Sequence, residues 1–354
     1  MKKIIFFVCA FMCAHITVAQ NEFVATLTHD QVNSAFYGHD ALKSALEKAE
    51  DGDIINLSAG TFYAPSTISK AVTLQGAGMY GGAGKETVIS SNFYINMAGD
   101  DSHRFSAEGI HFSGTITFQN AINPYFIKCL FYTITYDNTA CDVANAMLIN
   151  CVVRNGLYIG GFGSFEITCV NSFVGWFKNY ATTSKAYFQN CIVFAKEGND
   201  VVTTTFYNCI VPMYYYYSST TLYTSLPASC TAYNTLFFNF AYSSYGTCYV
   251  NISAASGANN WALTGNQFSA LFKSLSCSKE TDVSNLYGES VVYALLPKAA
   301  QQYLGTDSTQ IGMQGGAFPY NYIPTYPRIT KFNAASSADE EGKLKVDIEV
   351  TKAE

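Results

Sequence analysis

Hydrophobic and polar residues follow two different periods along the chain. Between Asp40 and Asp51 apolar residues recur at helical spacing, Asp40 is a suitable N-cap and Gly52 ends the pattern. This stretch therefore predicts a short helix. The period then changes to two in short runs separated by Gly, Ser and Asn, such as 54–57, 71–74 and 87–89. Helical spacing returns only near 268–275 and 297–304, so we expect an all-β body of many short strands.

Seven cysteines recur with a period near twenty residues. Their spacings are 22, 18, 22, 18, 21 and 18 residues, and they are Cys129, Cys151, Cys169, Cys191, Cys209, Cys230 and Cys248. Several share one context, as in Leu148-Ile-Asn-Cys151-Val and Phe188-Gln-Asn-Cys191-Ile. Such a repeat predicts a solenoid whose turns stack about 4.8 Å apart around a continuous core. The alternative is a β-sandwich, which the long shared context disfavours.

The asparagine before several of these cysteines suits a corner of the solenoid. Asparagine tolerates the left-handed backbone that a corner needs. We also expect its side chain to hydrogen-bond to its copy in the next turn.

Two stretches carry a resemblance to a known family. Residues 41–62 contain Gly52-Asp-Ile-Ile-Asn-Leu-Ser-Ala-Gly-Thr-Phe62, and with 68–76 they resemble the opening of right-handed parallel β-helix proteins of the pectin-lyase-like superfamily. Leu304-Gly-Thr-Asp-Ser-Thr-Gln-Ile-Gly-Met-Gln-Gly-Gly316 is similar to a closing motif of secreted bacterial members. The resemblance implies a right-handed parallel β-helix of roughly ten turns with an N-terminal capping helix. It implies no single activity, since the superfamily includes lyases, hydrolases, esterases and non-enzymatic adhesins or scaffolds.

The N-terminus reads as a secretory signal peptide. Lys2 and Lys3 precede an apolar run, and Thr17-Val-Ala19 offers small residues for cleavage after Ala19. The run has about 15 apolar residues, fewer than the ~20 of a membrane-spanning helix. We therefore expect export to the periplasm, the cell surface or the medium, and no membrane span.

The chain divides into four expected parts: a signal peptide (1–19), an N-terminal strand and capping helix (20–53), the parallel β-helix (54–320) and a C-terminal β-hairpin (321–354). The hairpin is predicted from two alternating runs joined by the acidic turn 338–342. One interpretation is that it covers the open C-terminal end of the solenoid. The other is that its exposed edge docks a partner.

Composition narrows the classes of partner. Hydrophobic residues make up 49% of the chain, which excludes a disordered protein, and charged residues only 13%. The net charge is −6 and the arginines are Arg104, Arg154 and Arg328. A nucleic-acid partner is excluded because it requires a basic face.

The nine cysteines that follow the signal peptide predict a ladder of buried thiols. Equivalent residues on stacked turns lie about 4.8 Å apart, which exceeds the 3.5–4.5 Å between the Cβ atoms of a disulfide. No Cys-x-x-Cys occurs and no histidine follows His111, so no metal site is expected.

One compact cluster joins acid, base and cation: Asp100, Asp101, His103 and Arg104. Two carboxylates can hold Ca²⁺ and a histidine or arginine can remove a proton, so this is the fallback catalytic site of a lyase. The alternative is a polar corner, since adjacent strand residues point to opposite faces. A second candidate pairs Glu166 with Lys185 or Arg154 on neighbouring turns.

The central turns are poor in the groups that family enzymes use. Residues 113–272 contain ten charged residues and 201–272 none. The resemblance implies that lyases of this fold need several carboxylates and a basic residue on one face. Apart from the Ca²⁺ of that alternative, we expect no cofactor, and the sequence leans against an enzyme.

Tyrosines crowd the uncharged stretch. In a strand alternate residues face outward, and exposed tyrosines can stack on sugar rings and hydrogen-bond their hydroxyls. The expected ligand-binding residues are Tyr214, Tyr215, Tyr216, Tyr217, Tyr223, Tyr242 and Tyr245. Alternatively, loops fold over the solenoid and bury the rings. We expect a secreted non-catalytic module that binds a polysaccharide or a surface partner; the alternative is a polysaccharide lyase or glycoside hydrolase.

Overall fold

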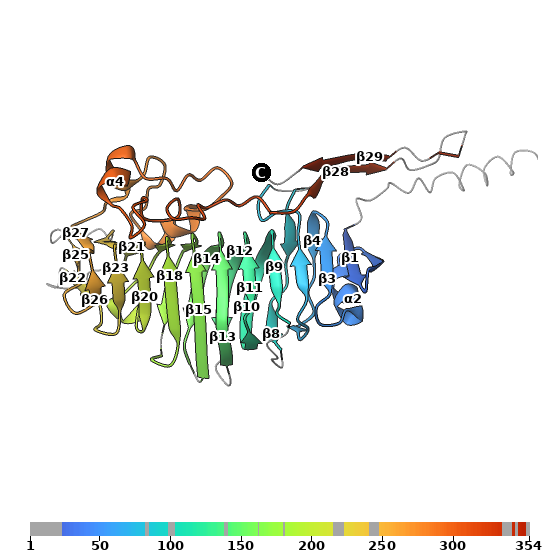
Figure 1. Ribbon diagram of the computed structural model, residues 1–354, viewed down its shortest axis with the longest axis horizontal. Coiled ribbons are helices and arrows are strands. Elements are labelled where there is room, and N and C mark those ends of the chain that lie inside the picture. Colours follow the sequence, from blue (N-terminus) through green and yellow to red (C-terminus); the bar gives the residue numbers. More distant parts are fainter. Residues whose placement is uncertain are drawn as a thin grey trace, which may run out of the picture.

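The computed structural model describes residues 23–81, 85–97, 103–137, 141–161, 163–179, 181–214, 223–240, 248–334, 342–343 and 346–351. The expected signal peptide lies outside them. The described chain is a parallel β-solenoid with about 10% helix, which confirms the predicted fold class (Figure 1). About eight turns are complete, with a strand on each of three faces, whereas roughly ten turns were expected. Several turns are longer than twenty residues: Asn208, Asn234 and Asn259 occupy one corner and are 26 and 25 residues apart.

The turns have three faces, and each face is a parallel sheet. The first face consists of β3 (Ile54–Leu57), β6 (Thr73–Gln75), β9 (Ser106–Glu108), β11 (Tyr125–Ile127), β13 (Cys141–Ile149), β15 (Gly163–Val170), β18 (Lys185–Gln189), β20 (Thr204–Tyr207), β23 (Thr231–Tyr233) and β26 (Ser256–Ala258). The second face consists of β4 (Gly60–Phe62), β7 (Thr87–Ile89), the starts of β10 (Ile110–Ile122), β12 (Leu130–Tyr136) and β14 (Val152–Ile159), then β16 (Phe173–Val174), β19 (Ile192–Val193), β21 (Ile210–Met213), β24 (Leu236–Asn239) and β27 (Trp261–Leu263).

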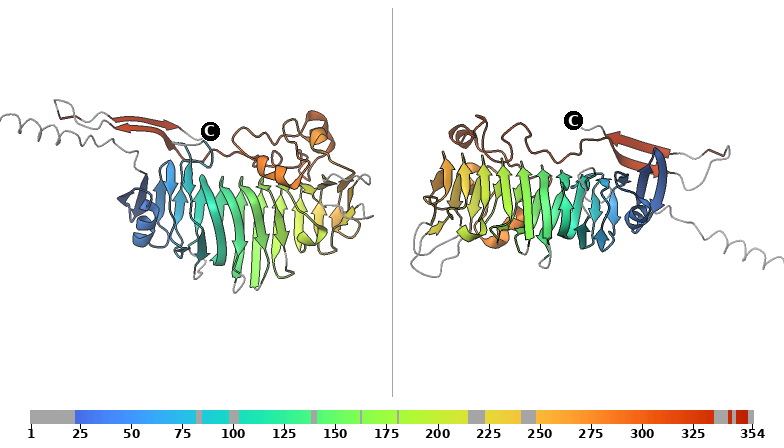
Figure 2. Two further views of the ribbon diagram at one scale, coloured as in Figure 1. Left: turned by 180° about the vertical axis from the view of Figure 1, so that it is seen from behind. Right: turned by 60° about the horizontal axis from the view of Figure 1, so that its bottom comes forward.

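The third face is less regular. It begins with β5 (Thr67–Ile68), β8 (Phe93–Asn96), the later parts of β10, β12 and β14, and β17 (Phe177–Asn179). One turn has the 3₁₀ helix η1 (Gly198–Asp200) in this place, and the next two have β22 (Tyr223–Ser225) and β25 (Tyr249–Asn251). The views in Figure 2 show the stacked strands along the whole length of the solenoid.

The main core fills the interior of the turns. Alternate residues point inward, so each turn adds apolar side chains to the same rows. Phe112 stacks on Phe131 with ring centroids 5.1 Å apart, and Phe188 stacks on Phe206 at 5.4 Å. Because one turn cannot bury its own apolar side, the fold depends on stacking.

The N-terminal end is closed by a short helix and a hairpin. β1 (Val24–His29) pairs antiparallel with β2 (Val32–Tyr37) and with β3. The helix α2 (Ala41–Lys48) buries Ala41, Leu42, Ala45 and Leu46. Asp40 precedes the helix as predicted, but its side chain makes no capping hydrogen bond.

Residues with left-handed backbone form the corner between the first and second faces. Six are the corner asparagines, with φ between +45° and +57°: Asn150, Asn171, Asn190, Asn208, Asn234 and Asn259. Asparagine is among the few residues that adopt this conformation readily. The corner is therefore where the sequence predicted it.

The cysteine repeat is only partly a structural repeat. Cys129, Cys151, Cys191 and Cys209 directly follow the corner, and Ser172 and Thr235 fill this corner slot in other turns. Cys169 instead lies inside β15, in register with Leu148 and Phe188. Cys230 and Cys248 precede β23 and β25. The seven cysteines are buried and form no disulfide, as predicted, but they do not form a single ladder. Turn lengths vary, so a similar spacing does not put each cysteine at an equivalent position.

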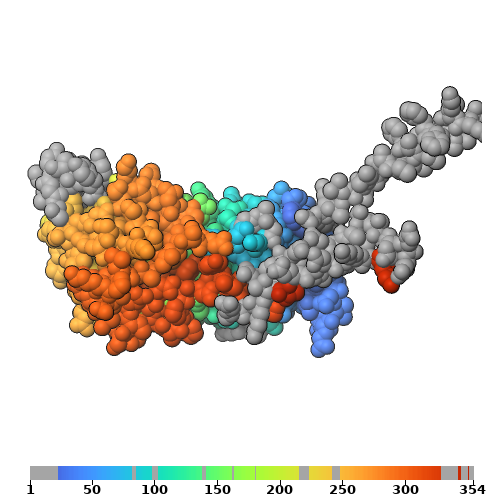
Figure 3. Space-filling view, turned by 90° about the horizontal axis from the view of Figure 1, so that it is seen from above, coloured from blue at the N-terminus to red at the C-terminus, as the bar shows by residue number. Residues whose placement is uncertain are grey.

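A covering segment, residues 264–327, folds back over the outside of the second face (Figures 1 and 3). It contains α3 (Phe268–Leu271), η2 (Glu280–Asn285) and α4 (Pro297–Gln302). The outward residues of the second face and the apolar residues of this segment form a second core. Its solenoid side includes Leu130, Val152, Phe173, Ile192, Ile210 and Leu236, and its covering side includes Phe268, Leu271, Phe272, Tyr293 and Met313.

The covering segment is held by the corner asparagines and by two earlier turns. Asn171 Nδ2 donates to the carbonyls of Met313 and Gly315, and Asn208 Oδ1 accepts from the Thr306 amide. Further along, the Tyr326 hydroxyl donates to the Gly76 carbonyl at 2.6 Å. The asparagine side chains were expected to bond to their copies in the next turn; in these turns they bind the covering segment instead. The predicted closing motif therefore docks along the corner.

The C-terminal hairpin lies away from the end that it was expected to cover. β28 (Arg328–Ala334) pairs antiparallel with β29 (Val346–Thr351) and with no other described strand. The covering segment carries the chain back to Gly76 before β28 begins. The hairpin therefore emerges beside the early turns (Figure 1), and the interpretation as a C-terminal cover is wrong.

Candidate functional site

The fallback catalytic cluster is not assembled within the described chain. Asp100 and Asp101 lie outside the described residues. The Arg104 guanidinium carbon lies 4.2 Å from the ring centroid of Tyr125, a cation–π contact on the first face. His103 packs against Gly52. The two described residues of the cluster, His103 and Arg104, therefore each contact a different neighbour.

Glu166 and Lys185 are neighbours, as expected for adjacent turns. Lys185 Nζ lies 2.9 Å from Glu166 Oε1, and this hydrogen bond together with the carboxylate charge raises the pKa of Lys185. A raised pKa favours the charged ammonium, which is the opposite of what a general base requires. Arg154 does not join them, since its guanidinium lies over the ring of Tyr287. The pair is an exposed ion pair.

The expected tyrosine site is only partly described. Tyr215, Tyr216, Tyr217, Tyr242 and Tyr245 lie outside the described residues. Tyr214 is half-buried in the second core, with Phe240 5.3 Å and Trp176 6.3 Å away between ring centroids. Tyr223 is exposed on the third face.

Two pairs of tyrosines stack in register on adjacent turns. Tyr207 and Tyr233 lie on the first face with centroids 5.0 Å apart and an interplanar angle of 9°. Tyr223 and Tyr249 lie on the third face at 5.4 Å and 29°. Tyr207, Tyr223 and Tyr249 are about 40% exposed. Parallel register places these rings in rows that follow the solenoid axis.

Two outward rows of the first face around Tyr207 consist of uncharged residues. One outward row comprises Thr168, Tyr187, Thr205 and Thr231, and the next comprises Val170, Gln189, Tyr207 and Tyr233. Hydroxyl, amide and aromatic groups alternate there at the spacing of the strands. These two rows can hydrogen-bond and stack, and the Glu166–Lys185 ion pair lies in the neighbouring outward row of the same face.

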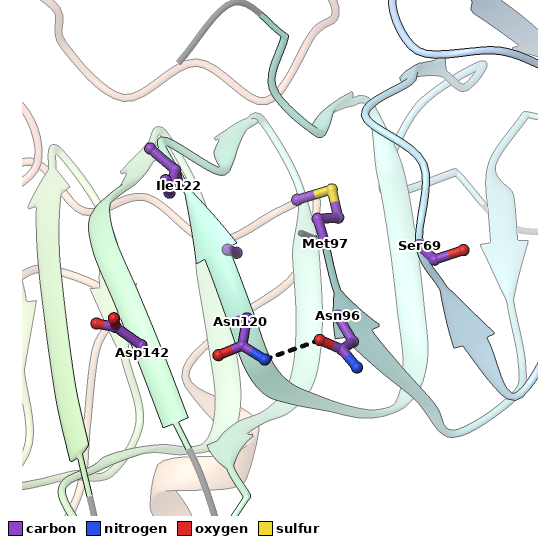
Figure 4. A pocket seen from close by; sticks show the side chains of 7 residues that line it. Ser69, Asn96, Met97, Asn120, Ile122 and Asp142 are labelled. Carbon is purple, nitrogen blue, oxygen red and sulfur yellow. Dashed lines mark hydrogen bonds between the residues drawn. The ribbon is translucent and has the colours of Figure 1, made fainter. Parts of the chain in front are cut away.

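A hollow opens at the corner between the third and first faces (Figure 4). Its volume is about 450 Å³, and it is lined by Ser69, Asn96, Met97, Asn120, Ala121, Ile122 and Asp142. Asn96, Asn120 and Asp142 hold equivalent positions on three successive turns, and Ser164 follows on the fourth. Together these four residues form a polar ladder.

Hydrogen bonds order the polar ladder. Asn120 Nδ2 donates to Asn96 Oδ1 at 2.9 Å, and Ser164 Oγ donates to Asp142 Oδ1 at 2.8 Å. This ladder was not predicted from the sequence. The available signal was spacing, because Asn96, Asn120 and Asp142 are 24 and 22 residues apart, close to the period of the corner asparagines.

His111 is a second group that sequence reasoning did not place. It lies on β10 in register with Val88 and Leu130, in the outward row of the second face. Both ring nitrogens are buried and make no hydrogen bond with the described residues. Burial, and then the charge of Arg154, lowers the pKa of His111 to about 4.

Two absences hold for the described residues. None of their helices has the length and apolar character of a membrane span. They also contain no group of three or more His, Cys, Asp or Glu side chains placed to hold a metal ion.

Comparisons with known proteins gave no relative. No protein-family model, curated protein or solved structure matches this chain.

Proposed function

We propose that this protein is a secreted, non-catalytic β-helix module that binds polysaccharide through its stacked tyrosines. The observation that carries the proposal is the pair of in-register stacks, Tyr207 on Tyr233 and Tyr223 on Tyr249. A polysaccharide repeats one unit along its length, and these rings repeat along the solenoid. Aromatic faces pack against the apolar faces of sugar rings, while phenol hydroxyls bond to sugar hydroxyls.

The electrostatics support a binding role. Residues 201–272, which supply both stacks, contain no charged residue. Proton transfer in glycoside cleavage requires a pair of suitably placed acid and base groups. In the exposed pair Glu166–Lys185, the carboxylate and the ammonium group bind each other. Secretion, and membership of the pectin-lyase-like superfamily, belong to this proposal and rest on the signal-like N-terminus and on the opening and closing motifs.

The test is binding of the mature protein to soluble polysaccharides by isothermal titration calorimetry. The probes are a neutral glucan, a neutral mannan and a polyuronate, each with and without Ca²⁺. Replacing both Tyr207 and Tyr233 by Ser should weaken binding roughly tenfold or more, since each aromatic contact contributes about 1 kcal/mol. Tyr223→Ser with Tyr249→Ser tests the third face in the same way.

Tyr37→Ser is the matched control, because Tyr37 is 62% exposed on the N-terminal hairpin. It should leave affinity unchanged. Equal binding by all variants would contradict the aromatic role. New reducing ends or unsaturated products would contradict the non-catalytic role and support a hydrolase or a lyase.

A further inference from the structure

The hollow beside the polar ladder is large enough to hold a small ligand. Its volume of about 450 Å³ falls within the roughly 300–1,000 Å³ of small-molecule pockets. Its polar residues come from strands that are fixed by parallel register on successive turns. Figure 4 shows Asn96, Asn120 and Asp142 side by side on these strands.

The polar ladder leaves hydrogen-bonding groups unused. Asn120 Nδ2 and Asn96 Oδ1 satisfy each other, and Asp142 Oδ1 is satisfied by Ser164. Among the described residues no partner is recorded for Asn96 Nδ2, Asn120 Oδ1 or Asp142 Oδ2. The hollow thus presents a donor and two acceptors in a row, each oriented by a neighbour. This preorganisation lowers the entropic cost of binding.

Apolar atoms complete the lining. Met97, Ala121 and Ile122 lie among the polar side chains, and Met97 and Ala121 are buried. A donor and two acceptors beside apolar atoms match the hydroxyls and the apolar face of a sugar ring.

The charge of the hollow selects among sugars. Among the described residues of its lining, Asp142 is the one ionisable side chain. A lone carboxylate accepts hydrogen bonds from sugar hydroxyls and repels a uronate. We propose that the hollow lined by Ser69, Met97, Ile122 and the ladder residues Asn96, Asn120 and Asp142 binds one neutral sugar unit. This inference rests on the proposed polysaccharide-binding function and adds a polar subsite, on earlier turns than the tyrosine stacks, that selects uncharged sugars.

The test uses the mature full chain with its asparagine side chains labelled with ¹⁵N. Neutral gluco- and manno-oligosaccharides, and an oligouronate of equal length, are titrated while the side-chain amide signals of Asn96 and Asn120 are followed by NMR. The neutral oligosaccharides should shift these signals and the oligouronate should not. The amide of Asn33, in the N-terminal hairpin, serves as the internal control.

Two variants separate charge from shape. Asn120→Ala with Asp142→Ala removes two acceptors and should weaken neutral-sugar binding roughly tenfold or more. Asp142→Asn keeps an oxygen acceptor without the charge, so it should hold neutral-sugar affinity within about threefold and admit the oligouronate. Thermal melting checks that each variant is folded.

The outcomes distinguish the two proposals. If Tyr207→Ser with Tyr233→Ser weakens polysaccharide binding and the Asn120/Asp142 variant does not, the hollow proposal is overturned and the proposed function stands. If the native protein binds no polysaccharide but short neutral sugars shift Asn96 and Asn120, the function fails and the hollow remains a sugar site. Unshifted amides with every sugar overturn the hollow proposal.

Discussion

At the residue scale, the position directly after each corner is occupied by cysteine in some turns and by serine or threonine in others. The hydrogen bonds made at this position explain why these residues can replace one another. Cys191 Sγ lies 3.2 Å from the carbonyl oxygen of Gln189 and 3.3 Å from that of Cys169. Ser172 Oγ donates to the corresponding carbonyl of Val170 at 2.8 Å. A small side chain with a hydrogen-bond donor therefore satisfies the carbonyls at this position. The nine described cysteines form no disulfide with one another.

We predict opposite outcomes for two serine substitutions. Cys191→Ser keeps the donor of the corner slot and should cost less than about 1 kcal/mol of unfolding free energy. Cys169→Ser should cost about 2 kcal/mol, because no hydrogen bond of the Cys169 side chain is recorded and a hydroxyl there is buried without a partner. Urea unfolding measures both. Equal costs would contradict the distinct placements of these cysteines.

The corner asparagines adopt a left-handed backbone, and some of them also hydrogen-bond through their side chains. A comparison of Asn171 with Asn259 separates these two contributions. Asn171 is fully buried and donates to two carbonyls of the covering segment, whereas Asn259 is exposed at the last corner. Both have positive φ.

Replacing each asparagine by alanine should give different losses of stability. Asn259→Ala should cost about 1 kcal/mol through left-handed strain alone. Asn171→Ala should cost about 3 kcal/mol, since it also leaves two buried carbonyls unsatisfied. The unfolding free energies from urea titration decide the point, and a loss at Asn171 no larger than that at Asn259 would show that the side-chain bonds contribute nothing.

At the element scale, the covering segment makes the second face a buried sheet. The outward row of that face is apolar from Leu130 to Leu236, and the covering segment turns this row into part of a second core. Large apolar patches of this kind otherwise promote association. His111 lies in the same outward row as Leu130 and Val152, so its environment depends on this cover.

The buried His111 predicts acid sensitivity. Its folded pKa of about 4 lies below the 6.5 of an unfolded histidine, so the neutral form is favoured by folding. Stability from this group is complete above pH 6.5 and is lost as the pH falls from 6.5 toward 4. Between neutral pH and pH ~4.5 the native chain should lose about 2 kcal/mol more than His111→Leu. Identical losses in the two proteins, measured by urea unfolding, would contradict the buried neutral histidine.

At the scale of the whole molecule, charge is absent from the late turns. The stretch 201–272 carries none, and the exposed rows of the first face offer hydroxyls, amides and rings. Long-range electrostatic attraction therefore contributes little to any ligand bound there, and contact groups must supply the affinity.

Binding of a neutral polysaccharide should accordingly be insensitive to ionic strength. We expect its dissociation constant to change less than about twofold between low and high salt, because screening acts only on charges. Calorimetric titration at several salt concentrations is the measurement. A steep loss of affinity with salt would point instead to the lysines and arginines outside the tyrosine stacks.

Much of the fold was determined by the sequence. Period-two alternation, the Asn-Cys contexts and the motif at 52–62 predict stacked turns with a capping helix, since these signals come from local backbone geometry and burial. The corner asparagines were predicted for the same reason: left-handed backbone selects few residue types.

Tertiary structure decided which residues occupy equivalent positions on successive turns. Turns vary in length, so hydrogen-bond register, and not spacing, assigns Cys191 to the corner slot and Cys169 to the core. Register also aligns Asn96, Asn120 and Asp142 into the polar ladder. The apolar outer side of the second face decided the path of the covering segment. No local sequence pattern reveals this outer side, because the face exists only after the turns have stacked.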